Sequence, residues 1–91
     1  MDQPPALLGQ EECEHDGWPF TIRSFKTADG YFVQSFLRNM PVSHTYAVDE
    51  ETYQDQKRTT GTDPIATLVD IARGDLRNGT YRQWILHWAS Q

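Results

Sequence analysis

The sequence predicts an α+β domain in which an antiparallel β-hairpin or three-stranded meander is followed by one longer helix and a short C-terminal aromatic helix. Three observations support this prediction. Two aromatic-rich runs with alternating character flank a short turn, apolar residues recur at helical spacing after Asp63, and Trp84 and Trp88 keep that spacing near the C-terminus. A chain of 91 residues, 37% of them hydrophobic, supports one hydrophobic core and therefore one domain.

Residues 1–16 are expected to form an acidic, largely flexible arm, which leaves residues 17–91 as the single α+β domain. The first seventeen residues contain five acidic side chains and no lysine or arginine, whereas the remainder contains eight acids and eight bases. Chain ends that nothing holds down tend to fray. The only apolar group of the arm, Ala6-Leu7-Leu8, is expected either to dock on a partner or to cover an edge of the chain's own fold.

The runs WPFTIRSFK and YFVQSFL, on either side of Thr27–Gly30, predict a β-hairpin. The sequence Thr-Ala-Asp-Gly fits a type I turn in which Gly30 takes the left-handed position of a bulge. Residues 43–48 are expected to add a third strand, because a long structureless loop is uncommon in so small a domain.

Asp49 is a candidate helix N-cap, with acids in the following turn and bases one helix length later. Tyr53 is the only apolar anchor of this segment, so a short surface helix and a solvated loop both remain open. Asp63-Pro64 is a clearer helix start, since a capping side chain precedes a proline at the first helical position. The apolar stripe of this longer helix consists of Ile65, Leu68, Val69, Ala72 and Leu76.

The longer helix is expected to stop at Gly79, or alternatively at Gly74. Thr80 is then a candidate cap for the last helix, in which Tyr81, Trp84, Ile85 and Trp88 fall on one face. A strand is the alternative for residues 81–88, because aromatic and β-branched residues also favour strands.

The alternation along the hairpin assigns two apolar faces. One face carries Phe20, Ile22, Ser24, Val33 and Leu37. The other carries Thr21, Arg23, Phe25, Phe32, Gln34 and Phe36. Because the second face of a one-sided antiparallel sheet is normally polar, the three phenylalanines predict that this face is covered as well. The cover is either the chain's own C-terminal segment or arm, a second copy in a homodimer, or another partner.

No catalytic set is recognisable, and the chain is predicted not to be an enzyme. Gly-x-Ser-x-Gly is absent from the sequence, and the only cysteine, Cys13, lies among acids that disfavour its thiolate. Residues 11–16 gather potential metal ligands, but a structural zinc site needs about four ligands from separated pairs, so neither a metal nor a cofactor is predicted. The lone cysteine and the absence of a signal-like or membrane-spanning stretch predict a cytoplasmic protein.

The leading functional prediction is a small non-enzymatic protein-binding or adaptor protein of undetermined process. The candidate partner-binding residues are Arg23, Phe25, Phe32, Phe36, Arg38, Leu7 and Leu8. One alternative is weak binding of single-stranded nucleic acid on the aromatic and arginine face, although the neutral domain supplies little steering of phosphates. The other alternative is an acidic inhibitor that blocks a basic protein site.

Overall fold

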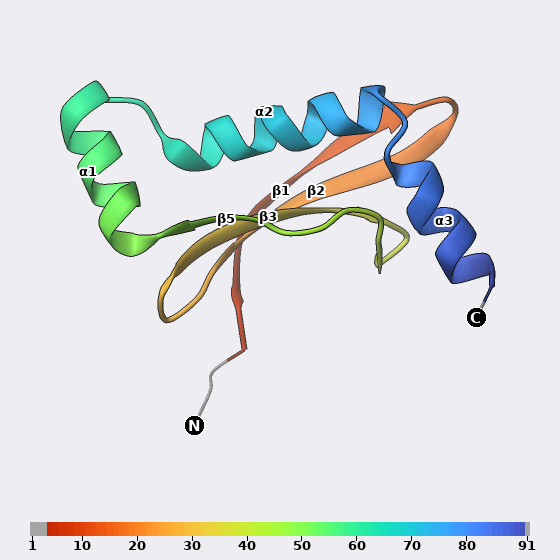
Figure 1. Ribbon diagram of the computed structural model, residues 1–91, viewed down its shortest axis with the longest axis horizontal. Coiled ribbons are helices and arrows are strands. Elements are labelled where there is room, and N and C mark those ends of the chain that lie inside the picture. Colours follow the sequence, from red (N-terminus) through yellow and green to blue (C-terminus); the bar gives the residue numbers. More distant parts are fainter. Residues whose placement is uncertain (1–3, 91) are drawn as a thin grey trace.

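A computed structural model describes residues 4–90 and confirms the α+β class, with an antiparallel sheet followed by helices of which the last is short (Figure 1). The elements in chain order are β1 (Ala6–His15), β2 (Trp18–Lys26), β3 (Gly30–Leu37), β4 (Met40–Pro41), β5 (Tyr46–Asp49), α1 (Glu50–Thr60), α2 (Pro64–Arg77) and α3 (Tyr81–Ala89).

The sheet has five strands, and every pairing in it is antiparallel. β1, β2 and β3 lie side by side as a meander. The outer edge of β3 is shared, because β4 pairs with its last residues and β5 pairs with its first residues. β1 and the β4/β5 pair therefore form the two edges of the sheet.

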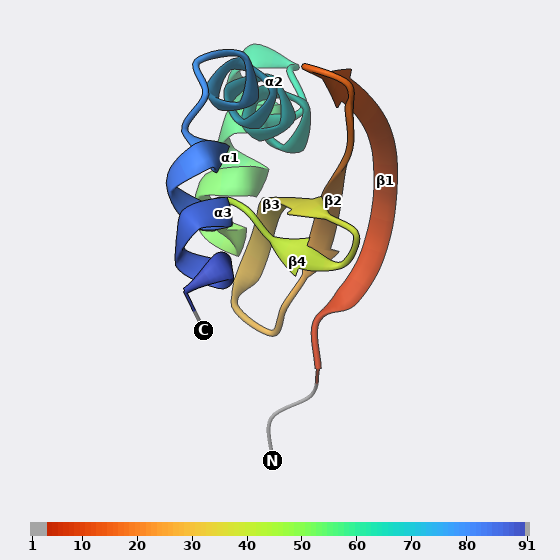
Figure 2. The ribbon, with the colours of Figure 1, turned by 90° about the vertical axis from the view of Figure 1, so that its right-hand side faces the viewer.

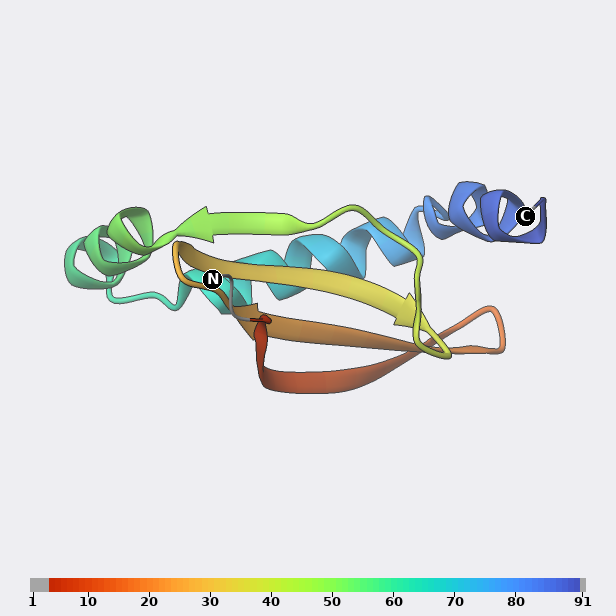
Figure 3. The same cartoon turned by 90° about the horizontal axis from the view of Figure 1, so that it is seen from below.

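α2 packs across one face of the sheet, and within residues 4–90 no helix lies in front of the strands when the sheet is viewed from the other side (Figure 3). Figure 2 shows α1, α2 and α3 gathered together beside the strands. The buried core between sheet and helices consists of Phe20, Ile22, Val33, Leu37, Val42, Tyr46, Ala72, Leu76 and Tyr81. The alternation predicted for the first face of the hairpin and the apolar stripe of α2 are thus both found in this core.

The predicted flexible arm differs from the structure, in which Ala6–His15 forms the edge strand β1. Main-chain bonds to β2 hold it, and they require no apolar side chains. Glu11 also pairs with Arg73 of α2. The connection to β2 is an Asp16-Gly17 turn with φ of 52° and 80°, the conformation of a type I′ hairpin.

The predicted left-handed conformation of Gly30 is wrong, since its φ is not positive. Thr27 closes this turn instead, because its hydroxyl accepts hydrogen bonds from the backbone N–H groups of Asp29 and Gly30. A glycine is needed for another reason. A Cβ at position 30 would lie 2.3 Å from the carbonyl oxygen of Val48, where the end of β5 pairs with the start of β3.

The segments that the sequence left open are helical. Asp49 is the N-cap of α1, and its side chain accepts a hydrogen bond from the Thr52 N–H. Gly61, with φ of 72°, is the C-cap. α2 continues through Gly74 to Arg77. Residues 81–89 form a helix rather than a strand.

Thr80 precedes α3 but does not cap it, because its hydroxyl donates to the carbonyl of Asp75. Among the residues that the structure describes, no helix is long and apolar enough to cross a bilayer.

Candidate functional site

The face of the sheet turned away from α2, here called the open face, is organised in rows that run across the strands. The register places side chains of paired residues on the same side, so each row can be followed from β1 to the opposite edge. The apolar row is Leu7, Phe25, Phe32 and Ala47. The next row is Gln10, Arg23 and Gln34, and the third is Glu12, Thr21, Phe36 and Pro41.

The three phenylalanines of the open face pack against one another. The rings of Phe25 and Phe32 are stacked, with centroids 4.8 Å apart and an interplanar angle of 22°. Phe36 meets Phe25 edge-on at 6.3 Å. All three rings are half-buried, and none belongs to the core between sheet and helices. The result is a continuous apolar surface on a rigid sheet.

Arg23 is held over this cluster by two contacts. Its guanidinium lies 4.5 Å from the centroid of the Phe36 ring, and it donates a hydrogen bond of 2.6 Å to the Asn39 side chain. Asn39 has a φ of 70° in the turn between β3 and β4. The turn therefore fixes the direction of the arginine, and the cation lies over the Phe36 ring.

The structure brings five of the predicted partner-binding residues onto one surface, and these are Leu7, Arg23, Phe25, Phe32 and Phe36. The other two lie at its margins. Arg38 is exposed in the β3–β4 turn with φ of 52°, and Leu8 lies at the irregularity in β1 between Leu7 and Gly9. The exposed fractions of Leu7 and Leu8 are 54% and 51%, so both large apolar side chains of β1 are accessible.

The intramolecular cover expected for this face is not found among residues 4–90. The sequence assigned it to the Trp84/Trp88 segment or to the arm. In the structure Trp84 and Ile85 pack against the same core as α2, and β1 extends the edge of the sheet instead of folding over it. Both segments are engaged elsewhere, so the phenylalanine cluster faces outward.

The acidic run is divided between the two faces of β1. Glu12 and Glu14 lie on the open face, whereas Glu11, Cys13 and His15 alternate with them toward the helices. Within residues 4–90, no three His, Cys, Asp or Glu side chains come together as metal ligands would.

Asp16 ties the first turn of the sheet to α3. Its carboxylate accepts a hydrogen bond from the Tyr81 hydroxyl and pairs with Arg82 at 3.2 Å. The Tyr81 hydrogen bond and, next, the nearby His15 lower the pKa of Asp16 below its ordinary value. Tyr46 donates to Asp75 in the core, and burial together with this bond raises the pKa of Tyr46. These polar contacts hold the helical layer on its side of the sheet.

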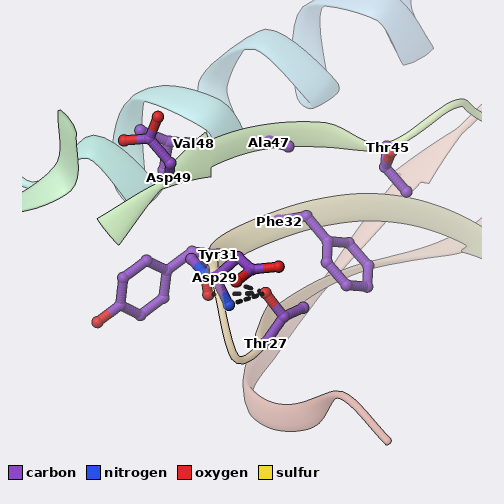
Figure 4. A pocket seen from close by; sticks show the side chains of 9 residues that line it. Thr27, Asp29, Tyr31, Phe32, Thr45, Ala47, Val48 and Asp49 are labelled. Atoms are coloured by element: carbon purple, nitrogen blue, oxygen red, sulfur yellow. Dashed lines mark hydrogen bonds between the residues drawn. The ribbon is translucent and has the colours of Figure 1, made fainter. Parts of the chain in front are cut away.

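A hollow of about 310 Å³ adjoins the apolar row at the end of the sheet, between the β2–β3 turn and β5 (Figure 4). Figure 4 shows Tyr31 and Phe32 directed to opposite sides of β3, with Phe32 and Ala47 leading back to the open face. The polar residues that line the hollow are Thr27, Asp29, Thr45 and Asp49.

A second apolar surface, which the sequence analysis missed, lies at the opposite end of the sheet beside α3. Trp18, Met40 and Leu86 are 42%, 40% and 68% exposed, and hollows of about 440 and 300 Å³ adjoin Trp18 and Ile85. The available signal was Asp16-Gly17, since recognising this hairpin turn would have placed Trp18 at the start of a strand.

Comparison with protein-family models, with curated proteins and with solved structures finds no match to this chain. The geometry of the open face is therefore the basis for a functional proposal.

Proposed function

We propose that this chain is a small non-enzymatic protein-binding module and that its open face is the docking surface. The observation that carries the proposal is the stacked Phe25–Phe32 pair, extended by Phe36 and Leu7, on a sheet face that no described helix covers. A solvated face of an antiparallel sheet is normally polar. Exposed apolar patches of a few hundred Å² are often functional surfaces.

The composition of the face supports a protein partner. Aromatic residues and arginine are enriched at the centres of protein interfaces, where they account for much of the binding energy. Here the aromatic cluster is central, Arg23 lies on it, and Glu12 and Glu14 are at the edge. The side chains project from paired strands and pack on one another, so little conformational entropy remains to be lost on docking.

Single-stranded nucleic acid is the weaker alternative for the same face. Bases stack on exposed rings while nearby cations hold the phosphates. On the open face, Arg23 is already engaged by Asn39 and Phe36, and two carboxylates share the surface. The chain as a whole carries a net charge of −5, which repels phosphates. Tryptophan fluorescence titration with a single-stranded oligonucleotide at low and high salt tests this alternative, and salt-sensitive binding lost in Arg23→Gln would favour it over a protein partner.

The acidic inhibitor receives less support from the arrangement of β1. Glu11 and Asp16 are paired with Arg73 and Arg82, so the run does not present a single acidic surface. A cytoplasmic location, expected from the single cysteine, stays part of the proposal.

Site-specific photo-crosslinking tests the proposed function. A benzoylphenylalanine replaces Thr21, which lies among the rings of the open face, and in a matched control replaces Ile71, which is 46% exposed on α2 in the opposite layer. We expect discrete protein adducts from position 21, and their loss when Phe32→Ser is added. Absence of adducts at position 21, or the same adducts from position 71, would overturn the proposal.

A further inference from the structure

We propose that the protein docked on the open face is a second copy of this chain, related by a two-fold axis that runs along the strands between β2 and β3. This proposal rests on the function proposed above and names its partner. The rows of the open face support both the partner and the axis, because under this axis each row of one copy fits the same row of the second copy.

The apolar and polar rows match under that axis. It exchanges β2 with β3 and one edge of the sheet with the other, so each residue meets the residue that lies across its own row. Phe25 therefore meets the second copy's Phe32, and Leu7 meets its Ala47. Arg23 meets Gln34 of the second copy rather than another Arg23, so the central cations do not oppose each other.

The charges at the turn end of the face complete the match. Glu14 pairs with Pro19 on β2, and Phe20 pairs with Leu37, so Glu14 on β1, Pro19 on β2 and Arg38 directly after β3 lie at one level. The axis brings Arg38 of each copy opposite Pro19 of the other, one strand spacing of about 4.8 Å from that copy's Glu14. By symmetry this charged contact forms twice. An axis running across the strands at the level of Arg23 would instead place the carboxylate of Glu12 on Leu7 of the second copy and oppose the two Arg23 side chains, and burial of charge disfavours both contacts.

The size of the face indicates a dimer of moderate strength. Four strands about 4.8 Å apart and four levels about 7 Å apart, namely the three rows and the level of Glu14 and Pro19, give roughly 500 Å² per copy. Two copies would bury about 1,000 Å², which is the lower limit for a specific interface. We therefore expect dimerisation that depends on concentration in the micromolar range.

Charge-swap variants test the axis directly. Glu14→Arg and Arg38→Glu each place two like-charged contacts in the dimer, and each should weaken dimerisation by about tenfold or more in sedimentation equilibrium. The double variant restores opposite charges at both contacts and should return dimerisation to the wild-type level. An equimolar mixture of the two single variants should form the mixed dimer, because one of its two contacts is native and the other is swapped.

Both positions are exposed, so circular dichroism is expected to show unchanged folding in all three variants. Additive weakening in the double variant, or single swaps without effect, would overturn the proposed axis. A wild-type protein that stays monomeric throughout the concentration range would overturn the second copy as partner. The crosslinking experiment then separates the two proposals. Adducts of position 21 with another protein would support the protein-binding function without the dimer, whereas adducts of twice the chain mass would indicate the dimer.

Discussion

The hydroxyl of Tyr81 donates a hydrogen bond of 2.8 Å to the carboxylate of Asp16, joining the first residue of α3 to the turn between β1 and β2. The Tyr81 ring also packs on Phe20 in the core, with centroids 4.7 Å apart. One side chain therefore connects the last helix, the first hairpin and the core.

This bond predicts a pH-dependent contribution to stability. The pKa of Asp16 is lowered in the folded state, so its contribution is present above the unfolded pKa of about 3.9 and is lost as the pH falls through the lower folded value. Tyr81→Phe should reduce the free energy of unfolding at neutral pH, and its difference from wild type should shrink below about pH 4. Urea denaturation over a pH series measures this, with Tyr53→Phe on α1 as the control. A difference that is the same at every pH would contradict the prediction.

Substitution of Gly30 should destabilise the protein because a side chain would collide with the backbone of β5, and not because of the backbone dihedral angles of Gly30. A Cβ there would meet the Val48 carbonyl at 2.3 Å and the Asp49 Cα at 2.7 Å, so β5 must shift. We expect Gly30→Ala to destabilise the protein by about 1–3 kcal/mol. Gly74→Ala is the matched control. No atom lies within 4 Å of its added Cβ, and alanine in a helix interior should stabilise by about 0.5–1 kcal/mol. Chemical denaturation in which Gly30→Ala is neutral would show that the close approach is absent.

Phenylalanine-to-alanine substitutions on the two faces of the sheet should differ in how much they lower the free energy of unfolding of the monomer. Phe20 is fully buried between sheet and helices, and Phe20→Ala should cost about 3–5 kcal/mol. Phe32 is half-buried on the open face, and Phe32→Ala should cost about 1–2 kcal/mol. Denaturation at low protein concentration compares them. Equal losses would mean that the open face is as well covered as the core.

The N-cap of α1 should stabilise that helix and leave the stability of the sheet unchanged. None of the residues of α1 is buried, so the helix depends on its ends, and the Asp49 carboxylate accepts the N–H of Thr52 at 2.7 Å. Asp49→Ala should speed amide exchange throughout α1 and leave exchange in β2 unchanged. Asp55→Ala, in the middle of the same helix, is the control. If both variants exchange alike, the cap does not hold the helix.

Much of the candidate site could be predicted because it is a consequence of alternation. Phe25 and Phe32 share a face with Arg23 in any antiparallel hairpin of that register, and no tertiary information is needed to say so. Leu7 could not be placed there from local sequence, since β1 is held by main-chain bonds to β2 and by long-range pairs such as Glu11 with Arg73. Asp16-Gly17 was the one local signal of this hairpin, and it was missed.

By itself the sequence determined the strands of the hairpin, the caps at Asp49 and Asp63, the stripe of α2 and the two apolar faces. Only the tertiary structure decided which face the helices would cover. Local periodicity cannot make that choice, because both faces are apolar. α1, α2 and α3 follow one another from the end of β5 through short connections. Once α2 packs on one side of the sheet, these connections keep α1 and α3 on that side as well. The phenylalanine face is left open for the same reason.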